Sequence, residues 1–216
     1  MTTDTIYALA TPPGRSGVAV LRVSGPAAID GLRRLIDSPP KPRTAALRTI
    51  RDPVTGEAID QGIVLLFPGP RSFTGEDMVE LQVHGGPAVI ADLLAALGRL
   101  PEHRPAEAGE FTRRAFVNGR MDLTEVEGLS DLVSAETSAQ RRFALREMAG
   151  ATRDRVEAWR RDLIHAMALL EAMIDFADEE DAPDDTRPEV AAPVAALWAE
   201  IEGQLAGAVR GGRLRA

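Results

Sequence analysis

The sequence predicts an α+β protein, in which a mixed α/β N-terminal domain is followed by an α-helical bundle domain. Residues 1–118 contain short apolar runs that alternate with period two and are separated by turns rich in glycine and proline. After residue 120 the apolar residues recur at spacings of three and four, which is typical of helices that pack in a bundle. We therefore place the domains at residues 1–118 and 119–216.

The expected elements of the N-terminal domain are strands interspersed with helices. The expected strands are Ile6–Thr11, Val18–Ser24, Ala45–Ile50, Gly62–Phe67 and Met78–His84. The expected helices are Pro26–Asp37 and Pro87–Leu100, and Pro87 suits the first position of a helix.

The last of these strands has two unlike faces. Apolar side chains point to one side of this strand, and they are Val79, Leu81 and Val83. The side chains that point to the opposite side are Met78, Glu80, Gln82 and His84. The apolar side belongs to a core. The other side is either the half-exposed surface of an antiparallel sheet or a ligand-binding surface that presents a carboxylate, an amide and an imidazole.

Helices dominate the second domain. A capping-box pattern at residues 122–125 predicts the start of a long helix, and a second helix is expected to contain Val156 to Ile174. A third helix is expected to begin near Thr186 and to end at Gly211-Gly212. The acidic stretch 171–189 between them is expected to be a solvated helix end and loop.

The composition is that of a soluble globular protein. The chain has 216 residues, of which 44% are hydrophobic and 27% charged, with a net charge of −8 and no cysteine. The acidic balance argues against a nucleic-acid surface that extends over the whole chain. No apolar run approaches the length of a membrane span, and the N-terminus has no signal-peptide pattern. A cytoplasmic location without disulfides is expected.

Two kinds of site are not predicted. A phosphate-binding P-loop requires a lysine in the pattern G-x-x-x-x-G-K-[ST], and the only lysine, Lys41, lies in Pro-Pro-Lys-Pro-Arg. This chain should therefore not hydrolyse GTP. His84, His103 and His165 lack the spacing of metal ligands, so no metal site is predicted.

Several long motifs occur in a fixed order along the chain. They are DTI-A-ATPPGR-G-V-LR-SG from Asp4, then DQG, FPGP-SFTGED-E-Q-HGGP and AGEFT-RAF-N. With these motifs the chain resembles the N-terminal part of the MnmE (TrmE) family of bacterial tRNA-modification GTPases, from Asp4 to about Leu214. The resemblance implies that the chain is a fragment that stops where the family enters its GTPase domain. It also implies that the helical domain is incomplete, because in the family a C-terminal segment completes it.

The resemblance further implies a reduced-folate site in the N-terminal domain, whose fold is similar to that of glycine-cleavage T-protein. Glu80 matches the folate-contacting glutamate of the family, and a carboxylate accepts paired N–H donors well. Arg22 matches an arginine at the end of the Val-Leu-Arg strand, and its guanidinium suits a carboxylate or carbonyl oxygen of the folate. Arg120 lies where the family commonly has lysine, so the positive charge is kept but the shape of the side chain differs. The sequence assigns no catalytic acid or base.

The implied activity involves several partners. A tetrahydrofolate, as the 5-formyl or 5,10-methylene form, would supply a one-carbon unit to C5 of the wobble uridine of tRNA, together with the flavin protein MnmG. The N-terminal domain would form the homodimer, with the folate pocket near the contact. GTP, magnesium and potassium would belong only to the absent GTPase domain. Arginines on helix surfaces are either ordinary surface residues or contacts to tRNA phosphates: Arg113, Arg114, Arg141, Arg142 and Arg146.

Three possibilities remain open. The chain is either a folate-binding module or a non-catalytic dimerisation scaffold that keeps the fold without the ligand. A stand-alone one-carbon transferase of the T-protein kind is the third possibility, and it would need a catalytic acid or base over the folate.

Overall fold

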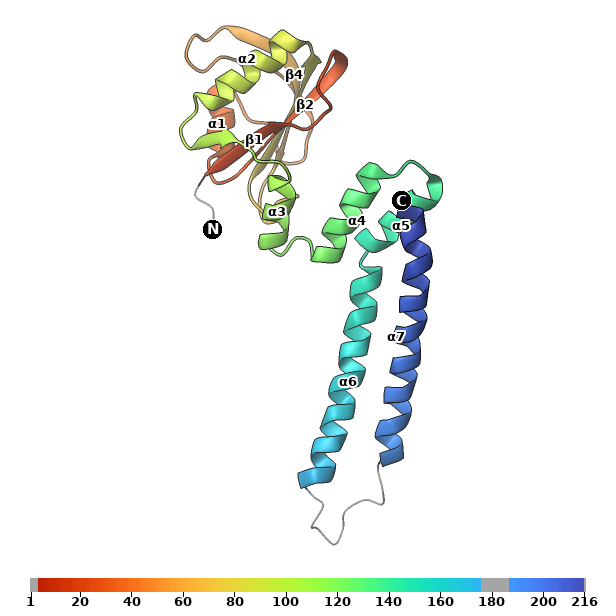
Figure 1. Ribbon diagram of the computed structural model, residues 1–216. Coiled ribbons are helices and arrows are strands. Elements are labelled where there is room, and N and C mark those ends of the chain that lie inside the picture. Colours follow the sequence, from red (N-terminus) through yellow and green to blue (C-terminus); the bar gives the residue numbers. More distant parts are fainter. Residues whose placement is uncertain (1–3, 176–186, 216) are drawn as a thin grey trace. The chain divides into compact units, whose positions relative to one another are not determined.

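The computed structural model describes residues 4–175 and 187–215 (Figure 1). The chain forms two compact units, Met1–Asp122 and Leu123–Ala216. The first contains a mixed sheet with helices and the second contains helices, so the predicted fold class is confirmed.

A six-stranded sheet forms the centre of the first unit. Its strands are β1 (Thr5–Leu9), β2 (Ser16–Ser24), β3 (Ala46–Arg51), β4 (Ala58–Phe67), β5 (Met78–Gly85) and β6 (His103–Pro105). They lie in the order β3-β4-β5-β2-β1-β6. All neighbours are antiparallel except β1 and β6, which are parallel. The helices of this unit are α1 (Ala28–Leu35), α2 (Pro87–Gly98) and α3 (Glu110–Val117).

The sequence predicted the first five strands and α1 and α2, but not β6 or α3. The strand β6 is too short to show alternation, because it has 3 residues and one of them is Pro105. The helix α3 follows Gly109, whose φ is 74°, and no side chain caps its first turn. It therefore lacks the Ser, Thr, Asp or Asn that marks a helix start in a sequence.

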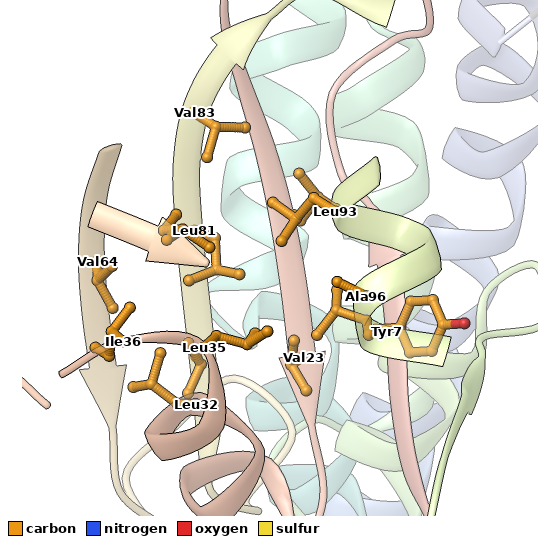
Figure 2. Close-up of a cluster of buried hydrophobic side chains, with 14 of the residues drawn as sticks. Tyr7, Val23, Leu32, Leu35, Ile36, Val64, Leu81, Val83, Leu93 and Ala96 are labelled. Atoms are coloured by element: carbon orange, nitrogen blue, oxygen red, sulfur yellow. The ribbon is translucent and has the colours of Figure 1, made fainter. Parts of the chain in front are cut away.

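One face of the sheet is covered by α1 and α2, and this layer is the hydrophobic core. Figure 2 shows Leu32, Leu35 and Ile36 from α1 and the residue that follows it, with Leu93 and Ala96 of α2, against the strands. The strand residues that complete the labelled cluster are Tyr7, Val23, Val64, Leu81 and Val83. Because this face is apolar and filled, any polar site of the sheet belongs to the opposite face.

The strand β5 has the two faces that its sequence predicted, with one exception. Val79, Leu81 and Val83 are buried in the core, whereas His84 is exposed. Met78 was expected on the exposed side, but it is only 3% exposed. It pairs in register with Ser24, which is also buried and which bonds the hydroxyl of Thr74. Residues of the loop before β5 therefore cover this end of the second face.

The second unit is helical. Its helices are α4 (Leu123–Ser134), α5 (Ser138–Met148), α6 (Ala151–Asp175) and α7 (Arg187–Arg215). The predicted first helix corresponds to α4, and the sequence did not predict α5, which begins at a capping box formed by Thr137 and Gln140. The helix α7 continues through Gly211-Gly212, so the predicted end was wrong. Glycine weakens a helix by only about 1 kcal/mol relative to alanine and does not by itself end one. Residues 176–186 of the acidic stretch lie outside the described residues.

An ion network around the buried side chains of Glu110 and Arg114 joins the start of the first unit to its end. Arg104 of β6 donates from Nη1 and Nη2 to the two carboxylate oxygens of Glu110, at 2.8 and 2.6 Å, and its Nε bonds Asp4. Arg114 of α3 donates from Nη2 to Glu110 Oε1 at 3.2 Å and to Asp4 Oδ1 at 3.0 Å. These bonds fix β6 and α3 against the chain before β1, and they explain why such short elements persist.

Glu110 is the most buried acid of this network. Its side chain is 1% exposed, and the hydrogen bonds from Arg104 lower its pKa from the ordinary 4.5 to about 2 against the opposing effect of burial. The backbone N–H of Glu107 and the guanidinium of Arg114 act in the same direction. Because the pKa is lower in the folded chain, ionised Glu110 stabilises the fold fully above pH 4.5, and this contribution is lost as the pH falls toward 2.

We predict that Glu110→Gln lowers the free energy of unfolding of the N-terminal unit at neutral pH by roughly 3 kcal/mol, which is the energy that corresponds to a fall in pKa from 4.5 to about 2. The variant should also lose less stability than the unmutated chain between about pH 4.5 and pH 2, which are the pKa values of Glu110 in the unfolded and folded chain. Urea unfolding followed by the methyl NMR signals of this unit measures both effects. Glu107→Gln is the control, since the Glu107 side chain is 70% exposed. Equal acid sensitivity of the Glu110→Gln variant and the unmutated chain would contradict this assignment.

Candidate functional site

Arg22 and Glu80 face each other on the two central strands of the sheet. They are register partners of β2 and β5, on the face opposite the core. Arg22 donates to one oxygen of Glu80, Oε1, from Nε at 3.1 Å and from Nη2 at 2.8 Å. Both side chains are partly accessible, 29% for Arg22 and 16% for Glu80. The structure thus brings two of the three predicted site residues into direct contact.

This pair retains hydrogen-bonding capacity. In the two described segments, neither Arg22 Nη1 nor Glu80 Oε2 has a hydrogen-bond partner. A carboxylate oxygen also has two lone pairs, so Oε1 can accept a further donor while it binds Arg22. The site therefore offers both a carboxylate edge and an unused guanidinium N–H to a ligand.

Aromatic rings lie beside this pair. The Arg22 guanidinium carbon is 5.3 Å from the ring centroid of Phe73 and 5.9 Å from that of Phe111. Phe73 comes from the loop before β5, and Phe111 comes from the first turn of α3. Both distances are within the range of a cation–π contact. Flat apolar surface beside a carboxylate and a guanidinium is suited to a planar ring with polar edges.

The loop that carries Phe73 is held by hydrogen bonds at both sides. Ser24 Oγ and Thr74 Oγ1 are 2.7 Å apart, and Asn118 Nδ2 donates to the carbonyl oxygen of Thr74 at 2.8 Å. Thr74 is fully buried. The motif FPGPRSFTGED is thus an ordered loop that covers part of the second face of the sheet.

Arg120 contacts the same loop and not the Arg22–Glu80 pair. Its Nε donates to the carbonyl oxygen of Ser72 at 3.2 Å, and its side chain passes beside Gly75. A Cβ added to Gly75 would lie 3.1 Å from Arg120 Cγ, and the φ of Gly75 is 82°, so a glycine suits this position. Arg120 therefore reaches the site only through the segment from Ser72 to Gly75.

The sequence missed the aromatic residues and the buried network behind the loop. Phe111 and Arg114 lie in the AGEFT-RAF-N motif, but the helix that contains them was not recognised, so their faces were not assigned. Arg114 was considered as a surface arginine, and this was wrong, since it is 4% exposed. Arg113 beside it remains on the surface, with its side chain 61% exposed.

His84 is separate from this site. Its Nδ1 lies 2.9 Å from Oδ1 of Asp60, and its backbone N–H donates to Asp60 Oδ2 at 2.8 Å. The histidine thus pins β5 to β4. Within residues 4–175 and 187–215 no group of three or more histidine, aspartate or glutamate side chains is arranged to hold a metal ion. No described helix combines the length and the apolar character needed to cross a membrane.

Comparison with known proteins matches both units of this chain. The family model for the GTP-binding protein TrmE N-terminus matches residues 5–120, and the model for the MnmE helical domain matches residues 123–216. The tRNA modification GTPase MnmE of Beijerinckia indica is 53% identical over 214 residues, which cover 99% of this chain and 48% of that protein. The mitochondrial 5-taurinomethyluridine-[tRNA] synthase subunit GTPB3 of Danio rerio is 55% identical over 212 residues, covering 98% of this chain and 42% of that protein.

The chain therefore spans a little less than half the length of these relatives, and the matched domains are the N-terminal and helical domains in that order. The expected family is confirmed by both domain matches and by the relatives. This chain belongs to the MnmE (TrmE) family of tRNA-modification GTPases and represents its N-terminal part.

Proposed function

We propose that the N-terminal unit binds a tetrahydrofolate one-carbon donor at the Arg22–Glu80 pair. The observation that carries the proposal is the open Oε2 of Glu80 beside a guanidinium and two phenylalanine rings. A pterin ring is flat and presents adjacent N–H donors at one edge. Glu80 would accept these donors, Arg22 would use its remaining N–H groups on a carbonyl or carboxylate oxygen, and a phenylalanine ring would stack on the ring plane.

Arg120 has a secondary part in this proposal. Its guanidinium donates to Ser72, so it would orient the loop or bind an anionic part of the folate from the edge of the site. Both the 5-formyl and the 5,10-methylene form present the same pterin edge to Glu80, so the proposed contacts apply to either ligand.

The larger activity follows as part of the same proposal. The named relatives are a tRNA modification GTPase and a subunit of a tRNA 5-taurinomethyluridine synthase. In the full protein, the bound folate would supply a one-carbon unit to C5 of the wobble uridine, with MnmG as the flavin partner. GTP, magnesium and potassium would act in a separate GTPase domain. We expect a cytoplasmic protein, although the relatives include mitochondrial subunits as well as bacterial proteins.

Binding of 5-formyl-tetrahydrofolate, measured by calorimetry, tests the folate site. We expect saturable binding by the unmutated chain and at least about tenfold weaker binding by Glu80→Ala and Glu80→Gln, since a charged hydrogen-bond acceptor is lost. His84→Ala is the matched control, because His84 lies on the same strand but pairs with Asp60 away from the Arg22–Glu80 pair, and the folate affinity of this variant should be unchanged. A folded chain that binds no folate would favour the scaffold alternative. One-carbon transfer from a small aminomethyl donor without MnmG would favour the stand-alone transferase.

The second face of the sheet also carries apolar residues that suit a homodimer contact. Leu47 of β3 and Ile63 of β4 are register partners, and they are 57% and 39% exposed. Ile63 pairs with Gln82 of β5, so this surface adjoins the strand that carries Glu80. We infer that a second copy of the chain covers Leu47 and Ile63 and thereby brings the dimer contact near the folate site.

Glutamate substitution tests this surface. We expect Leu47→Glu and Ile63→Glu to shift the chain from dimer to monomer in sedimentation equilibrium, because each places a charge in a desolvated contact. Val54→Glu is the control, since Val54 is 74% exposed in the turn between β3 and β4. Dimers that persist in both variants would place the contact elsewhere.

The helical unit presents apolar surface that the described residues do not cover. A pocket of about 640 Å³ lies among α4, α5, α6 and α7, and its apolar lining includes Phe143, Val156, Trp159, Ile201 and Leu205. Trp198 of α7 is 66% exposed. We infer that the C-terminal segment of the parent protein packs on this surface and completes the helical domain.

Tryptophan fluorescence tests the completion of this domain. In the full-length parent we expect Trp198 to be shielded, so that its emission is shifted to the blue and is less quenched by iodide than in this chain. In this chain, which has 2 tryptophans, a Trp159→Phe background isolates the signal of Trp198. In the full-length parent, the difference in emission between the Trp159→Phe variant with and without Trp198→Phe gives the signal of Trp198. The same quenching in both proteins would show that the segment packs elsewhere.

A further inference from the structure

The helix α3 and the residues after it form the back of the candidate site. Phe111 lies against the Arg22 guanidinium, Asn118 bonds the carbonyl oxygen of Thr74, and Arg120 bonds that of Ser72. The first contact comes from the first turn of α3, and the other two come from the residues that directly follow the helix. The segment therefore sets the position of the loop that holds Phe73.

Arg114 of the same helix is buried and makes several hydrogen bonds to acidic residues and to the backbone. Its Nη1 donates to Oε1 and Oε2 of Glu76, each at 3.2 Å, and to the carbonyl oxygen of Asp4 at 3.0 Å. Its Nη2 binds Asp4 Oδ1 and Glu110 Oε1. Because the side chain is 4% exposed, these bonds are shielded from water and hold Glu76 in one place.

Glu76 passes this constraint to the site. Its Oε2 accepts a hydrogen bond from Ser24 Oγ at 2.8 Å, and Ser24 is also 2.7 Å from the hydroxyl of Thr74. Thr74 directly follows Phe73, and Ser24 lies on the same side of β2 as Arg22. A continuous series of bonds thus runs from Arg114 through Glu76 and Ser24 to the loop residue beside Phe73.

We propose that Arg114 is a positioning residue of the folate site, acting through Glu76 and Ser24 on the loop that carries Phe73. This rests on the proposed folate binding. The role requires arginine, because one planar guanidinium serves Asp4, Glu76 and Glu110 at once, and a lysine ammonium cannot span three separated acceptors in fixed directions. The charged groups around Arg114 are these three acids together with Arg104, which shares Asp4 and Glu110.

A purely structural role makes a different prediction. In that case Arg114 only ties α3 to the start of the chain, and its loss lowers the melting temperature without changing the folate affinity of the folded protein. In the positioning role, its loss frees residues 72–77 and weakens folate binding even at temperatures far below unfolding.

Calorimetry with 5-formyl-tetrahydrofolate at 10 °C, together with amide hydrogen exchange, distinguishes the two roles. We expect Arg114→Met and Arg114→Lys to bind at least about tenfold more weakly, with faster exchange in residues 72–77 and unchanged exchange in β2 and β5. Arg113→Met is the matched control on the same helix, and it should bind like the unmutated chain. Ser24→Ala breaks the same series of bonds without removing a buried charge, and it should also weaken binding.

The outcomes separate this inference from the proposed function. If the unmutated chain binds folate and a folded Arg114→Met binds equally well, the positioning role is overturned and the folate site stands. If the Arg114 variants do not fold, Ser24→Ala decides, and unchanged affinity in that variant overturns the role. Failure of the unmutated chain to bind folate overturns both the proposed function and this inference.

Discussion

The antiparallel pairing of β2 with β5 is the interaction on which both faces of the N-terminal sheet depend. Its register places Leu21 beside Leu81 in the core and Arg22 beside Glu80 on the opposite face. Side chains alternate along a strand, so a slip of one residue would turn the charged pair into the core and the leucines out of it. The large cost of burying those charges and exposing the leucines therefore specifies the register, and the same register assembles the candidate site.

The features that could be read from the sequence are those with a local pattern. The alternation in β5, the turn before Pro87 and the helical spacing after residue 120 all predicted elements that the structure contains. The strand β6 and the helix α3 carry no such pattern, since tertiary ion pairs of Arg104 and Arg114 hold them in place. Met78 was also misplaced. The alternation of residues along β5 does not show that the loop before this strand covers this end of the sheet, where Met78 and its register partner Ser24 are buried. Arg22 and Glu80 were named from motifs, whereas Phe73, Phe111 and Arg114 required the fold.

Three arginines of the N-terminal unit have different roles because their side chains are buried to different extents. Arg22 is partly exposed and shares one oxygen of Glu80, which leaves donors for a ligand. Arg114 is buried and spends its terminal nitrogens on protein acceptors, which suits a fixed support. Arg113, next to it in the sequence, is exposed and pairs with Glu107 at 3.1 Å on the surface, where an ion pair contributes about 1 kcal/mol or less. Substitutions at neighbouring positions therefore probe different physical effects.

The contacts that close the N-terminal unit join its two ends. The strand β1 pairs with β6, and the side chain of Arg114 bonds Asp4 across a separation of 110 residues. Contacts between such distant residues form slowly, because the loop between them must first be ordered. During synthesis on the ribosome, the first strand emerges long before β6 and α3, so its outer edge stays unpaired until nearly the whole unit has been made. A chain interrupted before β6 would thus expose that edge to pairing with other chains, and the ordering of α3, behind the candidate site, would be the last step in making the domain.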